Sequence, residues 1–277
     1  MKNFALVEHP KIFNGKKFTK KYQKKEQNHK ICCMRKKQWV LVLDSGIGGQ
    51  WTLLELEKVL PKENFLFFMD KINAPYGNKS KFELCKIVTQ NIEKTKKFFD
   101  IKLIVLACNT ISAVCYDELC KKFFDTPIVK IHPFCDAKDF FGKPTLVLAT
   151  QNTAKYSAEL AKMAMQNKNV YVKSFATLAK KIDDANGKFD QLLPYLKTQL
   201  DPFCDLGIKN IVLGCTHYNF LKSQLVQIFG DVKFFENSTI VANQAKDILK
   251  RIGKLSAQKS GETIIFSKLP NKKFPSQ

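Results

Sequence analysis

Two cysteines, Cys108 and Cys215, end matching apolar stretches and are followed by polar residues. Residues 101–108 read IKLIVLAC and residues 208–215 read IKNIVLGC, so six of the eight positions are identical. A thiol has a pKa of about 8.5, and a nearby cation or helix start lowers that pKa enough to make the thiolate a usable base. Two such groups facing each other can remove a proton from one side of a carbon atom and deliver one to the other side, which inverts a stereocentre.

Other polar side chains follow the same kind of apolar stretch. Asp44 and Ser45 follow residues 39–43, and Asp70 follows residues 65–69. We expect His217 to exchange a proton with Cys215, and Asp44 to serve Cys108 in the same way. The hydroxyl and amide side chains nearby, together with backbone N–H groups at helix starts, suit a carboxylate ligand; they are Ser45, Asn109, Thr110 and Thr216.

The remaining cysteines and histidines carry weaker signals. A cysteine in an apolar segment is most often a small buried hydrophobe, and we interpret the following in that way: Cys85, Cys115, Cys120, Cys135 and Cys204. We expect no metal site, because Cys215 and His217 are too close in sequence for a usual zinc pair and Cys32-Cys33 lies in the N-terminal tail. His132, before Pro133, is expected to pack or to cap a helix.

The glycine-rich turn at Gly46–Gly49 allows a nucleotide-binding alternative. A strand precedes it, a helix follows it, and Asp70 lies 21 residues after Gly49, as in a dinucleotide-binding pattern. Trp51 stands where that pattern needs its third glycine, and no Gly-Lys-Ser/Thr sequence is present. A tight turn that exposes Asp44 and Ser45 therefore explains the glycines better.

Strands and helices alternate from residue 39 onward, which predicts parallel sheets covered by helices on both faces. The expected strands are 39–43, 65–69, 101–107 and 127–131, and the expected helices are 51–60, 80–99 and 111–123. Similar strands recur about 105 residues later, near 146–148, 170–173, 208–215 and 232–235, which indicates an internal repeat.

The repeat predicts an α/β fold of two similar domains with parallel-rich sheets, related by a pseudo-two-fold axis. Ligands of such sheets bind beyond the carboxyl ends of the strands, so we expect the active site in the cleft between the domains. The expected domains are residues 39–144 and 145–253. Residues 1–38 form a basic flexible tail and residues 254–277 a C-terminal segment, in which the chain can return to the first domain.

Composition narrows the class of protein. The net charge is +21, of which +10 falls in residues 1–38, and only Arg35 and Arg251 are arginines. Lysine excess without arginine is a poor match to specific phosphate or base recognition, so we expect only weak polyanion contact through the tail. The reduced cysteines expected here, and the lack of a signal peptide or an apolar run long enough for a membrane helix, predict a cytoplasmic protein. Met34 precedes the first strand, which suggests the hypothesis that the natural chain starts there.

Four motifs in order resemble those of glutamate racemase, in the aspartate/glutamate racemase superfamily. They are DSGIGG (44–49), PYG (75–77), ACNT (107–110) and GCTHY (214–218), and the resemblance covers about residues 39–253. It implies that Cys108 and Cys215 are the catalytic bases and that Asp44 and His217 assist them. It also implies a substrate site built from Asp44, Ser45, Tyr76, Gly77, Asn109, Thr110, Thr150, Thr153, Thr216 and His217.

The resemblance further implies reversible conversion of L- to D-glutamate without pyridoxal phosphate or another cofactor, for peptidoglycan synthesis, by a homodimer. Departures from the family pattern include the proline-free stretch Phe175–Asp184, where we expect Asp183 to replace a functional glutamate. Three other departures are His132, where a glutamate is usual before the proline, Asn219-Phe220, where a proline usually follows Cys-Thr-His-Tyr, and Glu236-Asn237-Ser238, where Asp-Ser is usual. Alternative functions are racemisation of aspartate or another acidic amino acid, and a racemase-like protein that binds DNA or gyrase.

Overall fold

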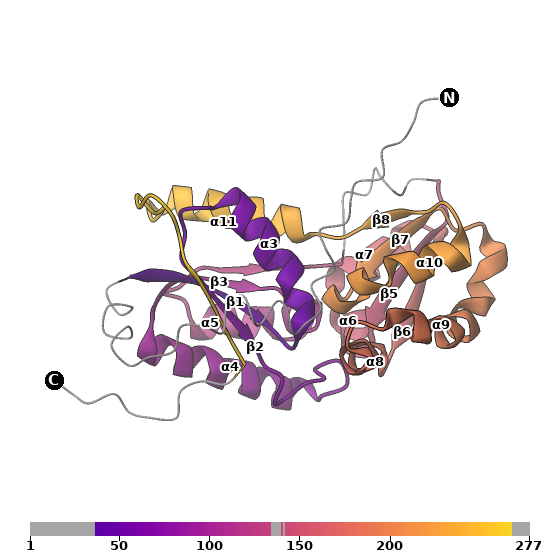
Figure 1. Cartoon of the computed structure of the whole chain (residues 1–277), viewed down its shortest axis with the longest axis horizontal. Coiled ribbons are helices and arrows are strands. Elements are labelled where there is room, and N and C mark those ends of the chain that lie inside the picture. The colour runs from indigo at the N-terminus through magenta and orange to yellow at the C-terminus, as the bar shows by residue number, and fades with distance from the viewer. Residues whose placement is uncertain (1–36, 134–139, 141, 268–277) are drawn as a thin grey trace.

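The computed structural model describes residues 37–133, 140 and 142–267. Two sheets lie one beyond the other along the long axis of the molecule, each covered by helices (Figure 1). Here, the first lobe means residues 37–133 with 238–267, and the second lobe means residues 142–237. Most of the predicted tail, including Cys32, Cys33 and Met34, lies outside the described residues, as does Cys135.

The first lobe contains a five-stranded parallel sheet of order β4-β3-β1-β2-β9. Its strands are β1 (Gln38–Asp44), β2 (Phe65–Met69), β3 (Asp100–Leu106), β4 (Ile128–Lys130) and β9 (Thr263–Phe266). Its helices are the short 3-10 helix η1 (Ile47–Gly49), α3 (Gln50–Val59), α4 (Lys81–Phe98), α5 (Asn109–Lys122) and α11 (Ser238–Arg251).

Side chains alternate along β1 and so build two separate cores in the first lobe. Leu41 and Leu43 pack with α4 and α5 on one face of the sheet. Val40 and Val42 pack with α3 and α11 on the other. The continuous apolar sequence of this strand follows from burial on both faces, as is usual in parallel sheets.

The second lobe contains a four-stranded parallel sheet of order β6-β5-β7-β8. Its strands are β5 (Thr145–Thr150), β6 (Val170–Phe175), β7 (Asn210–Gly214) and β8 (Lys233–Phe235). Its α-helices are α6 (Gln151–Tyr156), α7 (Ala158–Gln166), α8 (Leu178–Ala185), α9 (Leu193–Leu200) and α10 (Lys222–Phe229). Its 3-10 helices are η3 (Phe189–Leu192), η4 (Asp201–Leu206) and η5 (Thr216–Leu221).

The two sheets share one strand order. When β1, β2, β3 and β4 are matched in sequence to β5, β6, β7 and β8, the order β4-β3-β1-β2 of the first lobe becomes the order β8-β7-β5-β6 of the second. The predicted α/β fold with two parallel-rich sheets is therefore confirmed. The order places Cys108, after β3, and Cys215, after β7, at equivalent points of the two lobes.

The chain returns to the first lobe after β8. Helix α11 packs beside α3 (Figure 1), and β9 pairs with β2 at the sheet edge. At the two crossings between lobes, Asn237 Nδ2 donates a 2.6 Å hydrogen bond to the carbonyl oxygen of His132, so this histidine is packed where the crossings meet. The expected boundary at residue 253 stays a prediction, but α11 lies against the first sheet.

A buried ion pair ties the returning chain to this sheet. Lys102 Nζ lies 2.5 Å from Glu63 Oε2, with side chains only 3% and 2% exposed. The same ammonium group donates to the carbonyl oxygen of Lys254, and Glu63 Oε1 accepts from the N–H of Ser256. Burial of both charges is tolerable because each has an opposite charge and a further hydrogen-bond partner.

The cysteines differ from expectation in two respects. Cys85 of α4 and Cys115 of α5 form a disulfide inside the first core, so the expectation that every thiol is reduced was wrong for this pair. Cys204 is exposed rather than buried, because it lies on η4 at the edge of the second lobe. None of the helices in the described part of the chain is both long and apolar enough to cross a membrane.

Candidate active site

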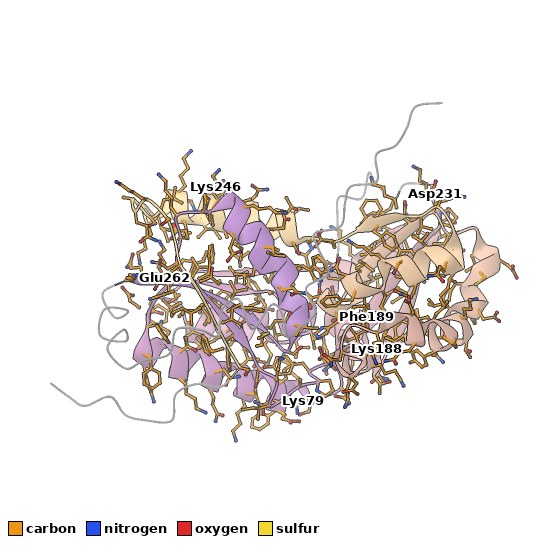
Figure 2. The ribbon with its side chains drawn as sticks, in the orientation of Figure 1. Lys79, Lys188, Phe189, Asp231, Lys246 and Glu262 are labelled. Carbon is orange, nitrogen blue, oxygen red and sulfur yellow. A yellow bond between two sulfur atoms is a disulfide. The ribbon has the colours of Figure 1, made fainter. Side chains whose placement is uncertain are left out.

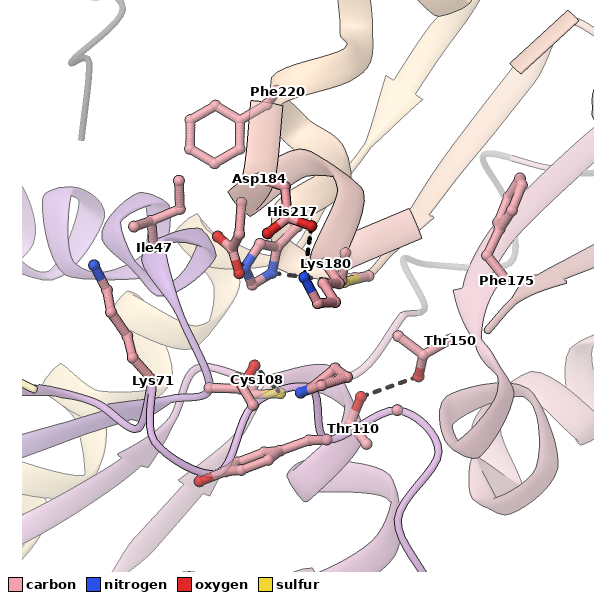
Figure 3. A pocket seen from close by; sticks show the side chains of 18 of the residues that line it. Ile47, Lys71, Cys108, Thr110, Thr150, Phe175, Lys180, Asp184, His217 and Phe220 are labelled. Atoms are coloured by element: carbon pink, nitrogen blue, oxygen red, sulfur yellow. Dashed lines mark hydrogen bonds and ion pairs between the residues drawn. The ribbon is translucent and has the colours of Figure 1, made fainter. Parts of the chain in front are cut away.

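A cavity of about 520 Å³ separates the lobes at the carboxyl ends of their strands. Figure 3 shows Cys108 and Thr110 on the wall from the first lobe, with His217, Lys180 and Phe220 on the facing wall from the second. Of the predicted site residues, the following line the cavity: Ser45, Tyr76, Gly77, Cys108, Thr110, Thr150, Cys215 and His217. The cleft expected from the repeat therefore holds both sulfur atoms.

Cys108 lies between β3 and α5 and is 5% exposed. Its sulfur is 3.9 Å from the hydroxyl oxygen of Ser45. Burial raises the pKa of the Cys108 thiol to about 12, and the charge of Asp44 adds to the rise, while the N–H groups of Ile111 and Thr110 oppose it. The expectation of a lowered thiol pKa was therefore wrong at this position, because burial outweighs the helix start.

Cys215 follows β7, and its partner His217 lies two residues further along the chain. The Cys215 sulfur lies 3.9 Å from His217 Nδ1, and His217 Nε2 lies 3.3 Å from Asp183 Oδ1 of α8. Burial lowers the pKa of His217, but the Asp183 carboxylate and the Cys215 sulfur outweigh burial and hold that pKa well above its ordinary value. His217 therefore lies where it can exchange a proton with the Cys215 sulfur.

Asp44 ends β1 behind the cavity wall and is fully buried. Its Oδ1 accepts from the N–H of Gly46 at 2.9 Å, and its Oδ2 accepts from the hydroxyl of Thr216 at 3.1 Å. Burial raises the pKa of Asp44 to about 6, although the charge of His217 and both hydrogen bonds favour the carboxylate. Asp44 therefore titrates close to neutral pH, where an acid/base group is most effective.

The glycine-rich turn packs against the second lobe instead of leaving room for a phosphate. A Cβ atom on Gly48 would collide with Thr216 Oγ1 and would lie 2.7 Å from the backbone nitrogen of His217. Only glycine allows this approach between η1 and η5. The turn brings Asp44 and Ser45 up to the Cys215 segment, and the nucleotide-loop interpretation has no geometric support.

A row of threonine hydroxyl groups crosses from the first lobe to the second at the cavity wall. Thr110 Oγ1 lies 3.0 Å from Thr150 Oγ1, which lies 2.9 Å from Thr153 Oγ1 (the first pair is drawn in Figure 3). Asn109 is buried beside Cys108, and neither atom of its side-chain amide has a hydrogen-bond partner among the described residues. Unpaired buried polar atoms are costly, so they mark a place where a polar ligand is expected.

Four predicted site residues do not line the cavity directly. They are Asp44, Asn109, Thr153 and Thr216, all of them buried behind the lining side chains. Thr153 contacts the lining residue Thr150, whereas Asp44 and Thr216 contact each other behind the wall. The structure thus brings together every position that the motifs predicted, in two layers.

Asp70 supports the wall in a way that the sequence analysis missed. Tyr76 OH donates a 2.6 Å hydrogen bond to Asp70 Oδ2, and the side-chain amides of Asn73 and Asn91 donate to the same carboxylate. Burial and the charge of Asp70 raise the pKa of Tyr76 well above its ordinary value, so the phenol keeps its proton. The position of Asp70 at a strand end was the available signal, but its partners lie in two other segments.

An aromatic cluster at the cavity was also missed. The ring of Phe220 lies 5.5 Å from that of Trp51 on α3 and 5.2 Å from that of Phe189 on η3, measured between centroids. Phe220 and Phe189 line the cavity, whereas Trp51 belongs to the first lobe. These rings bridge the lobes with apolar contact. In the described part of the chain, no group of three or more potential metal ligands comes together.

The fold and the site define a class of protein, the racemases that hold a stereocentre between two thiols supplied by two similar α/β lobes. No protein-family model matches the chain. A curated glutamate racemase of Clostridium novyi (strain NT) is 34% identical over 235 residues, which cover 82% of this chain and 90% of that protein. The chain belongs to the glutamate racemase family.

Solved structures agree with this assignment. A glutamate racemase from Francisella tularensis in complex with D-glutamate has a TM-score of 0.71 and 27% identity, covering 83% of this chain and 87% of that one. The glutamate racemase isoform RacE1 from Bacillus anthracis has a TM-score of 0.69 and 28% identity, and the match covers 82% of this chain and 87% of that one.

Proposed function

We propose that this protein interconverts L- and D-glutamate by two-base proton transfer between Cys108 and Cys215. One sulfur, as thiolate, takes the α-proton and leaves a carbanion; the other, as thiol, gives its proton to the opposite face and becomes the thiolate. The roles are exchanged in the reverse reaction, so no net proton is consumed. The observation that carries the proposal is that both sulfurs line one cavity from equivalent strand ends.

The two sulfurs have different acid/base neighbours. Cys108, with a pKa of about 12, keeps its proton in the substrate-free protein. Cys215 lies beside His217, whose charge Asp183 stabilises. We infer that Asp44 and His217, the acid/base groups nearest to the two sulfurs, restore their protons between turnovers.

The wall of the cavity supports a small acidic substrate. Hydroxyl groups of Ser45, Thr110 and Thr150 face it, and the free amide of Asn109 lies behind Cys108. We assign these groups, with backbone N–H groups, to the two carboxylates, because hydroxyl, amide and backbone N–H groups can all donate hydrogen bonds to carboxylate oxygens. The D-glutamate formed serves peptidoglycan synthesis.

Deuterium uptake at the α-carbon tests this function directly. L-glutamate in heavy water, with the purified full chain and no added cofactor, should exchange its α-proton while D-glutamate accumulates, as followed by NMR and chiral chromatography. Aspartate measured in parallel should turn over far more slowly. If glutamate neither exchanges nor inverts, the proposed reaction is wrong; if aspartate is faster, the substrate assignment is wrong.

The setting of the reaction is also part of the proposal. We infer a cytoplasmic homodimer whose N-terminal tail makes weak polyanion contacts, which the +10 charge of residues 1–38 supports. Exposed apolar side chains on the first lobe, including Phe82 at 79% and Phe124 at 89% exposure, support burial against a second copy. Light scattering gives the mass in solution, and salt-dependent retention on heparin, compared with a chain lacking residues 1–36, tests the tail.

A further inference from the structure

Asn152 reaches from the second lobe to a loop of the first lobe that carries the cavity-lining residues Tyr76 and Gly77. It lies in the first turn of α6, between the hydroxyl-row residues Thr150 and Thr153, and is 8% exposed. Its contacts fall on residues 76–79, the end of the loop that follows β2. Figure 2 shows Lys79 at the edge of the first lobe that is nearest to the second.

Three hydrogen bonds join Asn152 to that loop. Its backbone N–H donates to the carbonyl oxygen of Gly77 at 3.0 Å. Its side-chain Nδ2 donates to the carbonyl oxygens of Tyr76 at 3.1 Å and of Lys79 at 2.8 Å. The second lobe supplies every donor and the first lobe every acceptor. A side-chain amide satisfies this arrangement because its two N–H bonds can point to two carbonyls, whereas a carboxylate has no proton to give.

The same loop is also held from within the first lobe, at Asp70, where it begins. The hydroxyl of Tyr76 is bonded to the buried Asp70. Beside it, Gly77 packs so closely on Thr150 that an added Cβ would lie 3.0 Å from the Thr150 Cβ. Tyr76, Gly77 and Thr150 all line the cavity, so the contact joins two pieces of its wall.

We propose that Asn152 is a positioning residue that clasps the Tyr76–Gly77 wall to the second lobe, so that the cavity holds its substrate in a closed form. The Thr216–Asp44 hydrogen bond is a separate bridge between the lobes, formed by different segments of the chain. Asn152 touches neither sulfur in the set of contacts described and acts through the wall. The kinetic part of this inference rests on the proposed racemase function, while the structural part does not.

The primary variant is Asn152→Ala, which removes both side-chain hydrogen bonds and keeps the backbone bond. Loss of these bonds should weaken the binding of substrate by the Tyr76–Gly77 wall, while the positions of the two sulfur atoms change little. We expect KM for glutamate to rise about tenfold with kcat changed by less than about threefold, in line with the net strength of two such hydrogen bonds. Asn210→Ala is the matched control, because Asn210 is also buried in the second lobe and its side chain donates to Thr145 within the sheet.

The isosteric variant Asn152→Asp separates donation from packing. At neutral pH its carboxylate would face two carbonyl oxygens, so KM should exceed that of Asn152→Ala. At about pH 5 a carboxyl group in this setting is protonated and can donate to one carbonyl, so its KM relative to wild type should fall again. A merely space-filling role would make Asn152→Asp resemble the wild type at every pH, and that result would overturn the proposal.

Hydrogen exchange tests the clasp without any assay of turnover. In the substrate-free full chain, Asn152→Ala should speed amide exchange in residues 76–84 at least several-fold, while Asn210→Ala leaves that segment unchanged. Unchanged exchange in Asn152→Ala would overturn the clasp even if the protein racemises glutamate. Faster exchange in a protein that shows no turnover would instead leave the clasp standing and refute the proposed reaction.

Discussion

The hydroxyl of Thr216 donates a 3.1 Å hydrogen bond to Oδ2 of Asp44, and this bond joins the two lobes directly behind the sulfur atoms. Asp44 is the last residue of β1 in the first lobe, and Thr216 follows Cys215 in the second. The charge of Asp44 contributes to the raised pKa of Cys108. One buried carboxylate thus acts on the first thiol through its charge and holds the segment that carries the second.

Asp44→Asn should stabilise the protein while it lowers activity. The pKa of Asp44 rises from an ordinary 3.8 to about 6 on folding, so the folded state binds its proton more tightly than the unfolded state does. Stability therefore falls as pH rises from about 4 to about 6, by roughly 3 kcal/mol in principle. The variant should show no such fall, and its advantage in urea unfolding should grow between pH 4 and pH 7.

The exposed Asp100, at the start of β3, supplies the control for this experiment. Asp100→Asn should leave the pH dependence of unfolding as it is in the wild type. A constant difference between Asp44→Asn and the wild type from pH 4 to pH 7 would show that Asp44 does not titrate as the structure requires.

Removal of either thiol should separate proton exchange from inversion. Cys108→Ala and Cys215→Ala should each lower racemisation by about 10³-fold or more, since a positioned acid or base contributes on that scale. Each variant keeps one base, so slow deuterium exchange should persist with one enantiomer only, and the two variants should prefer opposite enantiomers. Cys215→Ser should behave like Cys215→Ala but retain more exchange.

Cys120→Ala is the matched control, because this free cysteine lies on α5 and does not line the cavity. It should racemise glutamate at the wild-type rate. Near wild-type turnover in Cys108→Ala would end the two-base mechanism.

Asp183→Asn should move the alkaline limb of the activity profile to lower pH. Asp183 is the main group that raises the pKa of His217 against the effect of burial. A raised folded pKa means that the charged histidine stabilises the protein at low pH and that this contribution is lost as pH rises through the folded pKa. If turnover requires a charged His217, activity should decline at lower pH in the variant than in the wild type.

Asp184→Asn provides the comparison, because that carboxylate also lines the cavity but pairs with Lys180 at 2.6 Å instead of with His217. Its pH profile should match the wild type. Profiles of kcat from pH 6 to pH 10 for all three proteins decide the matter, and superimposable limbs for Asp183→Asn and wild type would refute the role assigned to the pair.

Glu63→Gln should destabilise the first lobe strongly. The substitution leaves the Lys102 ammonium, which is 3% exposed, without its counter-charge, and breaking such a buried pair costs about 3–5 kcal/mol. Glu262→Gln breaks the exposed pair with Lys37 and should cost less than about 1 kcal/mol. Urea unfolding of both variants makes the comparison, and equal losses would show that the buried pair is not a principal tie of the returning chain.

The sequence was most informative where apolar strands and short motifs coincide. The strand predicted at 65–69 has the observed bounds of β2, and the others agree within a few residues. Burial on both faces makes such strands continuous apolar runs, which are easy to recognise. The motifs follow these strands directly, so locating the strands also located Cys108, Cys215 and their neighbours. Asp183 was found because it stands in a segment with a family counterpart, and it does contact His217.

The features that sequence missed depend on partners far away in the chain. Strand β9 is short and half-buried, and pairs with β2 almost 200 residues earlier. Asn152 is an ordinary helix residue until the loop of the other lobe is placed beside it. The direction of the Cys108 pKa change was wrong for the same reason, since burial is a property of the assembled lobes and not of the local motif.

The insertion of the second lobe between β4 and α11 has a consequence for synthesis. On the ribosome, β1 to β4 emerge first, but Val241, Ala242, Ala245 and Leu249, which cover one face of their sheet, follow only after residues 142–237 have been made. The first lobe therefore begins to form first but is completed last. Until α11 has been synthesised, one apolar face of its sheet remains exposed to solvent. Chaperone capture and premature aggregation should concentrate on that half of the polypeptide, while the inserted half matures on its own.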